Sequence, residues 1–192
     1  MSDALLSFFL QIIRFAIGAY VVVLLLRFLM QKLGANWHNQ VSQFVIRLTE
    51  KPLQPFRKVF PGVNGFDLSI LVFAFVLQFV GTGLIWWIAL GSFPHLAGVF
   101  LLVLSSILSK LVHIYIYAII IEVIASWIVP LRLHPAMHIV SLLVTPLLSF
   151  VRRYIPLVAG IDISPIPALL GLTLLNLLFT LPLESSGMRF MM

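Results

Sequence analysis

An arginine followed ten residues later by an aspartate occurs twice in this sequence, as Arg57 with Asp67 and as Arg152 with Asp162. Each aspartate precedes an apolar residue, a serine and a long apolar run. A carboxylate in that position can accept hydrogen bonds from the free amides of a helix N-terminus, so both aspartates are predicted helix caps. The nearby guanidinium can pair with the carboxylate or bind a lipid phosphate. An ion site between the two copies is the alternative interpretation.

Further basic residues surround the two pairs. The residues predicted to contact lipid phosphates or a protein partner are Lys51, Arg57, Lys58, Arg152 and Arg153. Basic connections of membrane proteins stay in the cytoplasm. Both basic segments are therefore predicted to be cytoplasmic, with the two termini and the uncharged connection "GSFP" outside.

Two charged residues inside apolar runs, Arg27 and Glu122, stand 95 residues apart at matching positions of the two copies. An unpaired charge in a membrane is costly, so they are predicted to pair across the copies. The alternatives are that each side chain reaches the cytoplasmic edge alone, or that the two serve an ion relay. His113 is a weaker candidate for a polar path, because a lone membrane histidine more often hydrogen-bonds between helices than binds a metal.

Signatures of enzyme chemistry are absent from the sequence. His134 and His138 have the spacing of metal ligands, but Pro135 disfavours helical geometry at His134. There is no cysteine. No glycine-rich nucleotide loop and no Ser/His/Asp arrangement is present. We expect no metal, no cofactor and no enzymatic activity.

Composition defines the class of protein. Hydrophobic residues make up 61% of the chain and charged residues 9%, whereas soluble domains are about a quarter charged. The chain is therefore predicted to be an integral membrane protein whose first apolar run stays in place as an anchor. Its expected partners are the bilayer, anionic lipid headgroups, and a membrane protein or a second copy of itself. The net charge of +6 is placed for a membrane surface, and no nucleic acid is expected.

The element order predicts a repeat. "PLQPFRKVFPGVNGFDLS" at 52–69 and "PLLSFVRRYIPLVAGIDIS" at 146–164 share nine of eighteen aligned positions when the later copy carries one extra residue. Such self-similarity indicates an internal duplication. The predicted units are residues 1–95 and 96–192.

The fold class predicted is all-α, with about four transmembrane helices. Residues 68–90 and 163–183 are uncharged and long enough to cross about 30 Å of hydrocarbon. Residues 4–30 contain Arg14 and Arg27, which are expected at the two membrane edges. Residues 96–129 are too long for one upright helix, so they either tilt and protrude outward, or residues 96–109 lie along the outer face.

An amphipathic helix is predicted between the spans of each unit, at residues 36–50 and 135–144. Pro52 and Pro146 are expected to end these helices, each before a basic turn. Because each unit then has two spans, the units should be parallel and related by a pseudo-twofold axis along the membrane normal.

The paired motif P-L-x-x-F…R-[KR]-x-x-P…G-x-D-[LI]-S, together with this element order, resembles the bacterial YggT family over nearly the whole chain. The family tends to carry an arginine near the end of its first span, followed by Ser-Trp. The first unit keeps Arg27 but reads "FLMQK", and the second keeps Ser126 and Trp127 but has Glu122 instead of arginine.

The resemblance implies a multi-pass protein of the bacterial cytoplasmic membrane. Bacterial members are linked to osmotic or ion stress, and relatives in cyanobacteria and plastids to division, nucleoid distribution and cytochrome assembly. Two hypotheses follow: a non-enzymatic scaffold or assembly factor that works through its basic cytoplasmic segments, and a small oligomeric ion channel or transporter whose path uses Arg27, Glu122 and His113.

Overall fold

The computed structural model describes residues 2–62, 67–128, 134–155 and 162–191, and all regular structure within these ranges is helical. Its elements are α1 (Ser2–Lys32), α2 (Gln40–Val59), α3 (Leu68–Leu90), α4 (Leu96–Trp127), α6 (Pro135–Arg152), α7 (Pro165–Leu175), the π-helical turn η1 (Asn176–Thr180) and α8 (Leu181–Met191). Five helical segments are long and apolar enough to cross a membrane, namely α1, α3, α4, α6 and the continuous α7–η1–α8. The prediction of an all-helical fold is confirmed for the described residues, and the five long apolar segments are consistent with a membrane protein.

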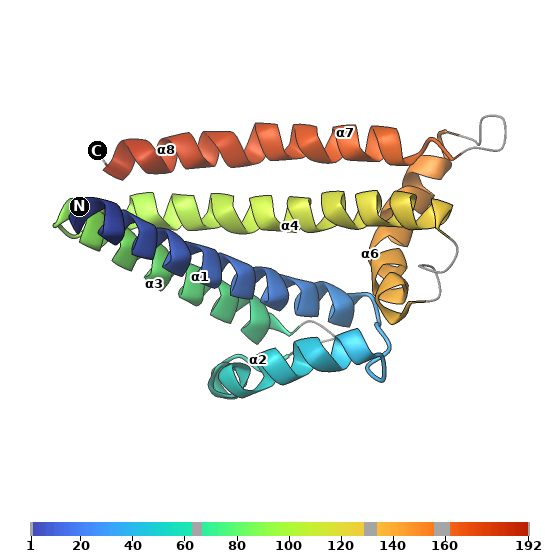
Figure 1. The fold of residues 1–192 in the computed structure, drawn as a ribbon, viewed down its shortest axis with the longest axis horizontal. Coiled ribbons are helices and arrows are strands. Elements are labelled where there is room, and N and C mark those ends of the chain that lie inside the picture. Colours follow the sequence, from blue (N-terminus) through green and yellow to red (C-terminus); the bar gives the residue numbers. More distant parts are fainter. Residues whose placement is uncertain (1, 63–66, 129–133, 156–161, 192) are drawn as a thin grey trace.

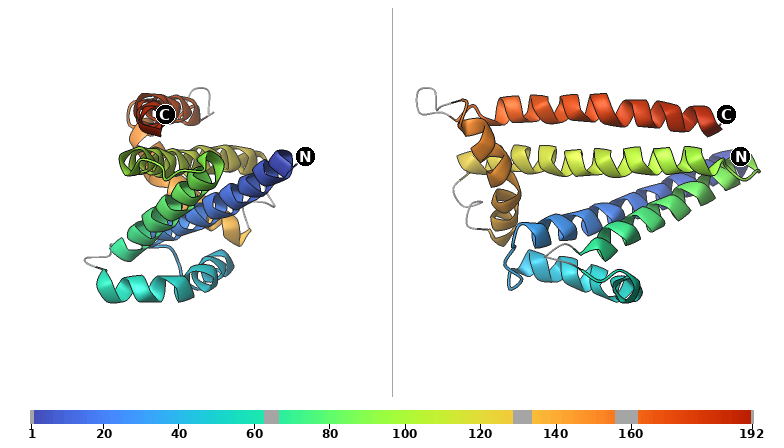
Figure 2. Two further views of the ribbon diagram at one scale, coloured as in Figure 1. Left: turned by 90° about the vertical axis from the view of Figure 1, so that its left-hand side faces the viewer. Right: turned by 180° about the vertical axis from the view of Figure 1, so that it is seen from behind.

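The long helices form two pairs (Figure 1). Helices α1 and α3 lie side by side, and α4 runs along α7–η1–α8. Both termini and the α3–α4 connection lie at one end of the molecule (Figure 2). At the other end α6 crosses the ends of α4 and α7, and α2 crosses beneath α1 and α3, running back toward the middle of the molecule. The order of a long helix, a crossing helix and a returning helix therefore occurs twice.

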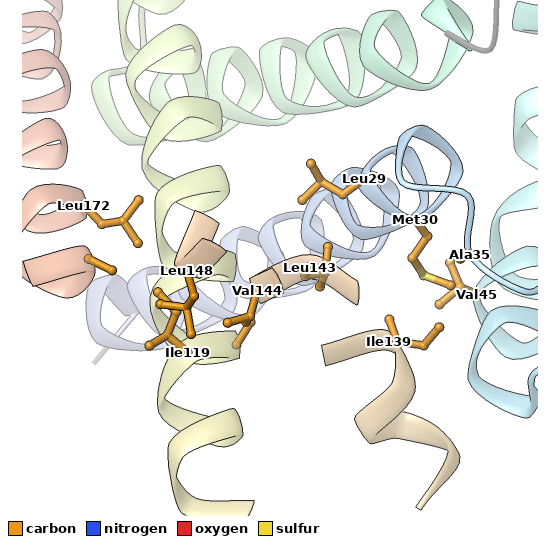
Figure 3. Packing of buried hydrophobic residues seen from close by; sticks show 12 residues of the cluster. Leu29, Met30, Ala35, Val45, Ile119, Ile139, Leu143, Val144, Leu148 and Leu172 are labelled. Carbon is orange, nitrogen blue, oxygen red and sulfur yellow. The ribbon is translucent and has the colours of Figure 1, made fainter. Parts of the chain in front are cut away.

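The best-packed region lies at the end that holds the crossing helices. Leu29 and Met30 of α1, Ile119 of α4 and Leu143 of α6 belong to one buried cluster, to which α2 and α7 also contribute (Figure 3). A second cluster joins α1 and α3 to Leu53 of α2. Lipid is as apolar as these side chains, so van der Waals packing holds the helices together.

At the opposite end of the molecule α1 is largely exposed, whereas α4 and α8 remain closely packed. The first half of α1 exposes large apolar side chains, among them Leu5, Phe8, Phe9, Ile12 and Phe15. Such surface is suited to contact with acyl chains. The crossing helices thus form the rigid end of the molecule.

Both crossing helices are longer than predicted, because the prolines expected to end them lie inside them. Helix α2 continues through Pro52 to Val59, and α6 continues through Pro146 to Arg152. Proline removes the amide that would bond the carbonyl four residues earlier. For Pro52 that carbonyl belongs to Leu48, and the Tyr20 hydroxyl donates to its oxygen at 3.0 Å instead. The helix bends but does not stop (Figure 2).

The basic residues consequently lie on helices. Arg57 and Lys58 occupy the last turn of α2 and Arg152 the last turn of α6, where cations stabilise the helix dipole. The remainder of each predicted turn includes residues 63–66 and 156–161, which lie outside the described residues.

Helix α4 is a single helix of 32 residues, about 48 Å at ~1.5 Å per residue. Residues 96–109 are its first part, so the alternative that they turn away along the outer face is wrong. Helix α4 exceeds the hydrocarbon thickness and must tilt or protrude, as the other alternative required.

Candidate functional site

Arg27 lies within the long apolar helix α1 and is buried, with 5% of its surface exposed. It lies near the C-terminal end of α1 and reaches across to α2. Its guanidinium donates to Thr49 Oγ1 at 2.6 Å and to Glu50 Oε2 at 2.5 Å. The buried cation is thus neutralised by the crossing helix of its own half.

The predicted pairing of Arg27 with Glu122 is wrong, because each has another partner. The Glu122 carboxylate accepts a hydrogen bond from Ser141 Oγ of α6 at 2.9 Å. In both halves, therefore, the charge on the long helix is satisfied by the crossing helix that follows it in the chain. The sequence positions are equivalent, but their side chains face their own crossing helices.

Glu50 connects Arg27 to a longer series of charges. Its other oxygen accepts from Arg57 Nη1 at 2.7 Å, and Arg57 donates from Nε and Nη2 to Asp67 Oδ2 at 2.9 and 2.8 Å. We call Arg27, Glu50, Arg57 and Asp67 the ionic chain. It has no net charge, and it links α1, α2 and the start of α3. The hydrogen bond from Arg27, with the charges of Arg27 and Arg57, outweighs burial and lowers the pKa of Glu50.

The second half keeps only part of this arrangement. Arg152 donates to Asp162 Oδ2 from Nε at 3.0 Å and from Nη2 at 2.6 Å. Burial raises the pKa of Asp162, but hydrogen bonds from Ser164 and Arg152 and the charge of Arg152 together lower it below the ordinary value. The residues of α6 that correspond to Glu50, Val144 and Thr145 at offsets of 94 and 95, carry no charge. The second half therefore has an isolated, more exposed ion pair in place of a chain.

The prediction that Asp67 and Asp162 act mainly as helix caps needs correction, because both carboxylates bind arginine. Asp67 does occupy the N-cap position of α3, but its side chain makes no capping hydrogen bond to the backbone. Its carboxylate accepts from Arg57 and from the Ser69 hydroxyl. Asp162 precedes the N-cap of α7, which is Ser164, and accepts the Ser164 amide at 3.0 Å. Charge-assisted bonds to arginine are stronger than neutral capping bonds, so arginine orients both carboxylates.

Helix α2 presents three faces along its length. Ser42, Val45, Thr49 and Leu53 are buried against the rest of the protein. Two exposed rows remain. The apolar row is Phe44, Leu48 and Val59, and the basic row is Arg47, Lys51 and Lys58. An apolar strip next to a basic strip is the arrangement of helices that lie in a membrane interface.

The residues predicted to contact phosphates therefore divide into two groups. Lys51, Lys58 and Arg153 are exposed and remain predicted contacts for lipid or a partner. Arg57 and Arg152 are engaged in the ion pairs with Asp67 and Asp162.

The histidines have local hydrogen-bonding roles. His113 Nδ1 lies 2.7 Å from the Ser109 carbonyl oxygen one turn earlier on α4. His134 Nδ1 accepts the Ala136 amide at 3.2 Å and caps α6. The described ranges contain no group of three or more side chains suited to a metal ion.

Asn39 is a structural link between the two halves that the sequence reasoning missed. Its Oδ1 accepts the Val41 amide at 2.9 Å and caps α2, and its Nδ2 donates to the Pro135 carbonyl oxygen at 2.8 Å. It thereby joins the starts of the two crossing helices. His134, the cap of α6, stands 95 residues after Asn39, so the offset of the repeat was the available signal.

The comparisons with known proteins identify the family. The family model described as CCB3/YggT matches the chain twice, at residues 6–88 and 101–183. "Uncharacterized protein PA0392" of Pseudomonas aeruginosa is 35% identical over 160 residues, which cover 83% of this chain and 81% of that protein. "Uncharacterized protein YggT" of Escherichia coli K12 is 30% identical over 171 residues, covering 89% and 88%. No solved structure matches the chain significantly.

Proposed function

The chain belongs to the CCB3/YggT family and contains two tandem copies of its unit, and on this basis we propose that it is a non-enzymatic scaffold or assembly factor of the bacterial cytoplasmic membrane. In the proposed topology α1, α3, α4 and α7–η1–α8 cross the bilayer as two parallel repeats. Helices α2 and α6 then lie at the cytoplasmic surface, and both termini lie outside.

The exposed surface of α2 is the observation that carries this proposal. Phe44, Leu48 and Val59 can enter the acyl boundary while the basic row stays at headgroup level. Each lysine or arginine near an anionic surface contributes about 1 kcal/mol of attraction. The ionic chain anchors α2 to α1 and α3, so the basic row is presented by a fixed helix.

Helix α6 has a different part in the proposal. It is long and apolar enough to cross a membrane, but it runs across the ends of α4 and α7, at a steep angle to both (Figure 1). Lying in the same interface as α2, it would bridge the two halves and widen the cytoplasmic surface. The partners we propose for this surface are anionic lipid headgroups and a membrane protein, or a second copy of this chain.

A role in osmotic or ion-stress tolerance is part of the proposal through family membership. The alternative function, a small oligomeric channel or transporter, was predicted to use Arg27, Glu122 and His113. These three side chains have separate partners. Arg27 binds Thr49 and Glu50, Glu122 accepts from Ser141, and His113 contacts Ser109. Flux of ions through liposomes that contain the purified protein would favour the alternative.

Spin labels placed singly along α2 test the surface role. In vesicles that contain anionic lipid, a label at Phe44 should be accessible to oxygen in the acyl region, and a label at Lys51 should be accessible to an aqueous relaxing agent. Equal aqueous exposure of both positions would contradict an interfacial α2. A label at Val80, which is exposed on α3, is the acyl-region control.

Photocrosslinking then tests for a partner. A photoreactive residue at Lys58 or Arg153 in living cells should capture one defined membrane protein, or a second copy of the chain, more strongly than the same residue at Val80. Equal capture at all three positions would mean that the basic surface recruits nothing specific.

A further inference from the structure

Two adjoining cavities lie between α1, α3, α4 and α8, away from the crossing helices. Their volumes are about 470 and 250 Å³, and both are lined by Leu102, Ser106, Lys110 and Glu184. We call them together the polar cleft. A membrane span takes about 20 residues. If each span is counted from the end that holds α2 and α6, the residues that line the cleft fall in the half of the membrane nearer the termini.

The lining of the cleft includes hydrogen-bond acceptors. Gln78 of α3 lines the smaller cavity and is 8% exposed. Its Nε2 donates to Thr82 Oγ1 at 3.3 Å, but its buried Oε1 has no partner. Glu184 of α8 adds a carboxylate that forms no ion pair within the described residues. An unpaired buried acceptor is costly, so Gln78 Oε1 is suited to an N–H donor of a ligand.

The lining also includes cationic donors. Lys110 of α4 donates from Nζ to the Ser106 hydroxyl, and it has no carboxylate within 4.0 Å in the described part of the chain. An ammonium carries three donors, so two are left for a ligand. Arg14 of α1 lines the same smaller cavity. Cations within a membrane are rarely left without a counter-charge.

We propose that the polar cleft binds a small zwitterion that carries anionic oxygen atoms and an N–H-bearing ammonium group. The anionic group faces Lys110 and Arg14, and the ammonium group faces Gln78 Oε1 and Glu184. Two sources fit this chemistry: a free solute of the amino-acid type, and the ethanolamine headgroup of a phospholipid.

Ligands of a single charge fit the cleft less well. A simple anion meets the Glu184 carboxylate and leaves Gln78 Oε1 unsatisfied. A simple cation meets Lys110 and Arg14. The cleft shares none of these residues with the surface of α2, so this binding is independent of the scaffold proposal and can fail or hold separately.

Titration of the purified full-length protein, reconstituted in nanodiscs free of phosphatidylethanolamine, tests the proposal. The probes are phosphoethanolamine and glycine as zwitterions, inorganic phosphate as the anion and ethanolamine as the cation. A ligand that binds the folded state raises the melting temperature with concentration. We expect at least one zwitterion to bind at least tenfold more tightly than either single-charge probe. Equal binding of inorganic phosphate, or no binding of either zwitterion in any lipid, would overturn the proposal.

Variants locate the site. Lys110→Gln and Glu184→Gln should each weaken zwitterion binding at least tenfold, and Arg189→Gln, at an exposed residue of α8 that lines neither cavity, should leave it unchanged. Lys110→Arg keeps the charge and should retain binding, which separates loss of the site from misfolding. If Lys110→Gln binds as the natural protein does, the cleft is not the site.

The lipid arm separates the two sources. If phosphatidylethanolamine added to the nanodiscs abolishes binding of the free zwitterion and raises the melting temperature only when Lys110 is present, the headgroup is the ligand. Phosphatidylcholine, whose ammonium group has no N–H, is the control and should do neither. Free zwitterion binding that persists with phosphatidylethanolamine present assigns the site to a soluble ligand.

Discussion

Arg27 and Glu50 form a 2.5 Å ion pair between a long apolar helix and the helix that crosses its end. Arg27 is buried, whereas the Glu50 side chain is 38% exposed. The pair therefore directs the Arg27 guanidinium towards the partly exposed Glu50 carboxylate near the C-terminal end of α1. It also fixes α2 at one angle to α1, because the adjacent Thr49 hydroxyl accepts from the same guanidinium.

A double-mutant cycle measures this pair directly. Arg27→Ala and Glu50→Ala should each lower the free energy of unfolding, and the double variant should lose less than the sum. Contacting charges typically couple by about 0.5–3 kcal/mol. The measurement is unfolding in mixed micelles. Arg27→Ala with Glu122→Ala is the control and should be additive, since Glu122 bonds Ser141. A larger coupling to Glu122 would restore the pairing between the two halves.

The lowered pKa values of Glu50 and Asp162 predict a pH dependence of stability. A carboxyl whose pKa is lower in the folded state adds stability that is complete above its unfolded pKa, about 4.3 for glutamate and 3.9 for aspartate. This stability is lost as the pH falls through the folded pKa. Melting temperatures should therefore decline below about pH 4.5. Glu50→Gln and Asp162→Asn should each flatten that decline, and an unchanged decline in both would contradict it.

The two hydrogen bonds of Asn39 predict two losses of stability that different substitutions can separate. Asn39→Ala removes both the cap of α2 and the bond to the Pro135 carbonyl. The cap alone is worth about 0.5–2 kcal/mol. Asn39→Ser keeps a capping oxygen but no donor, so it should lose only the bond between the crossing helices, roughly 0.5–1.5 kcal/mol. Free energies of unfolding decide between them. If serine is as damaging as alanine, the bridge matters and the cap does not.

The sequence predicted the elements better than their contacts. Uncharged runs locate α3 and the first part of α7–η1–α8, because a membrane span must be predominantly apolar; α8 continues past the predicted end at residue 183 and carries Glu184 and Arg189. The amphipathic pattern located α2 and α6, but proline rules placed their ends too early. The Tyr20 hydroxyl that replaces the missing hydrogen bond at Pro52 lies on α1, 28 positions before Leu48. Such a long-range contact cannot be recognised in the sequence around Pro52.

Partner choice at the candidate site was equally beyond local reasoning. Arg57 with Asp67 and Arg152 with Asp162 were visible as spacings, and both pairs form. The partner of Arg27 was assigned by repeat symmetry. The two halves had diverged, however, because the first has Glu50 and the second has the uncharged Val144 and Thr145 at the corresponding positions, so the symmetry did not extend to the side chains.

Gly98 and Gly187 predict a steric requirement between α4 and α8. A Cβ on Gly187 would lie 2.8 Å from Leu102 Cγ and 3.1 Å from the Gly98 carbonyl oxygen. Gly187→Ala should therefore push the helices apart and lower the free energy of unfolding. Gly171→Ala is the matched control, because nothing lies within 4 Å of its Cβ. It should be neutral or stabilising by up to about 1 kcal/mol, the helix propensity difference. The reverse order of the two variants would exclude this contact.

The orientation of the chain predicts a labelling pattern. The natural sequence has no cysteine, so single cysteines report without background. In the proposed topology Lys58 and Arg153 belong to the cytoplasmic end, and Phe93 and His95 belong to the α3–α4 connection on the outer side, at the end that holds the termini. In intact cells an impermeant thiol reagent should label Phe93→Cys and His95→Cys, and should label Lys58→Cys and Arg153→Cys only after permeabilisation. Phe93 is 82% exposed, so poor access does not explain a negative result there. Labelling at 58 or 153 with protection at 93 and 95 would invert the topology, and would place the basic row of α2 on the outer face of the membrane.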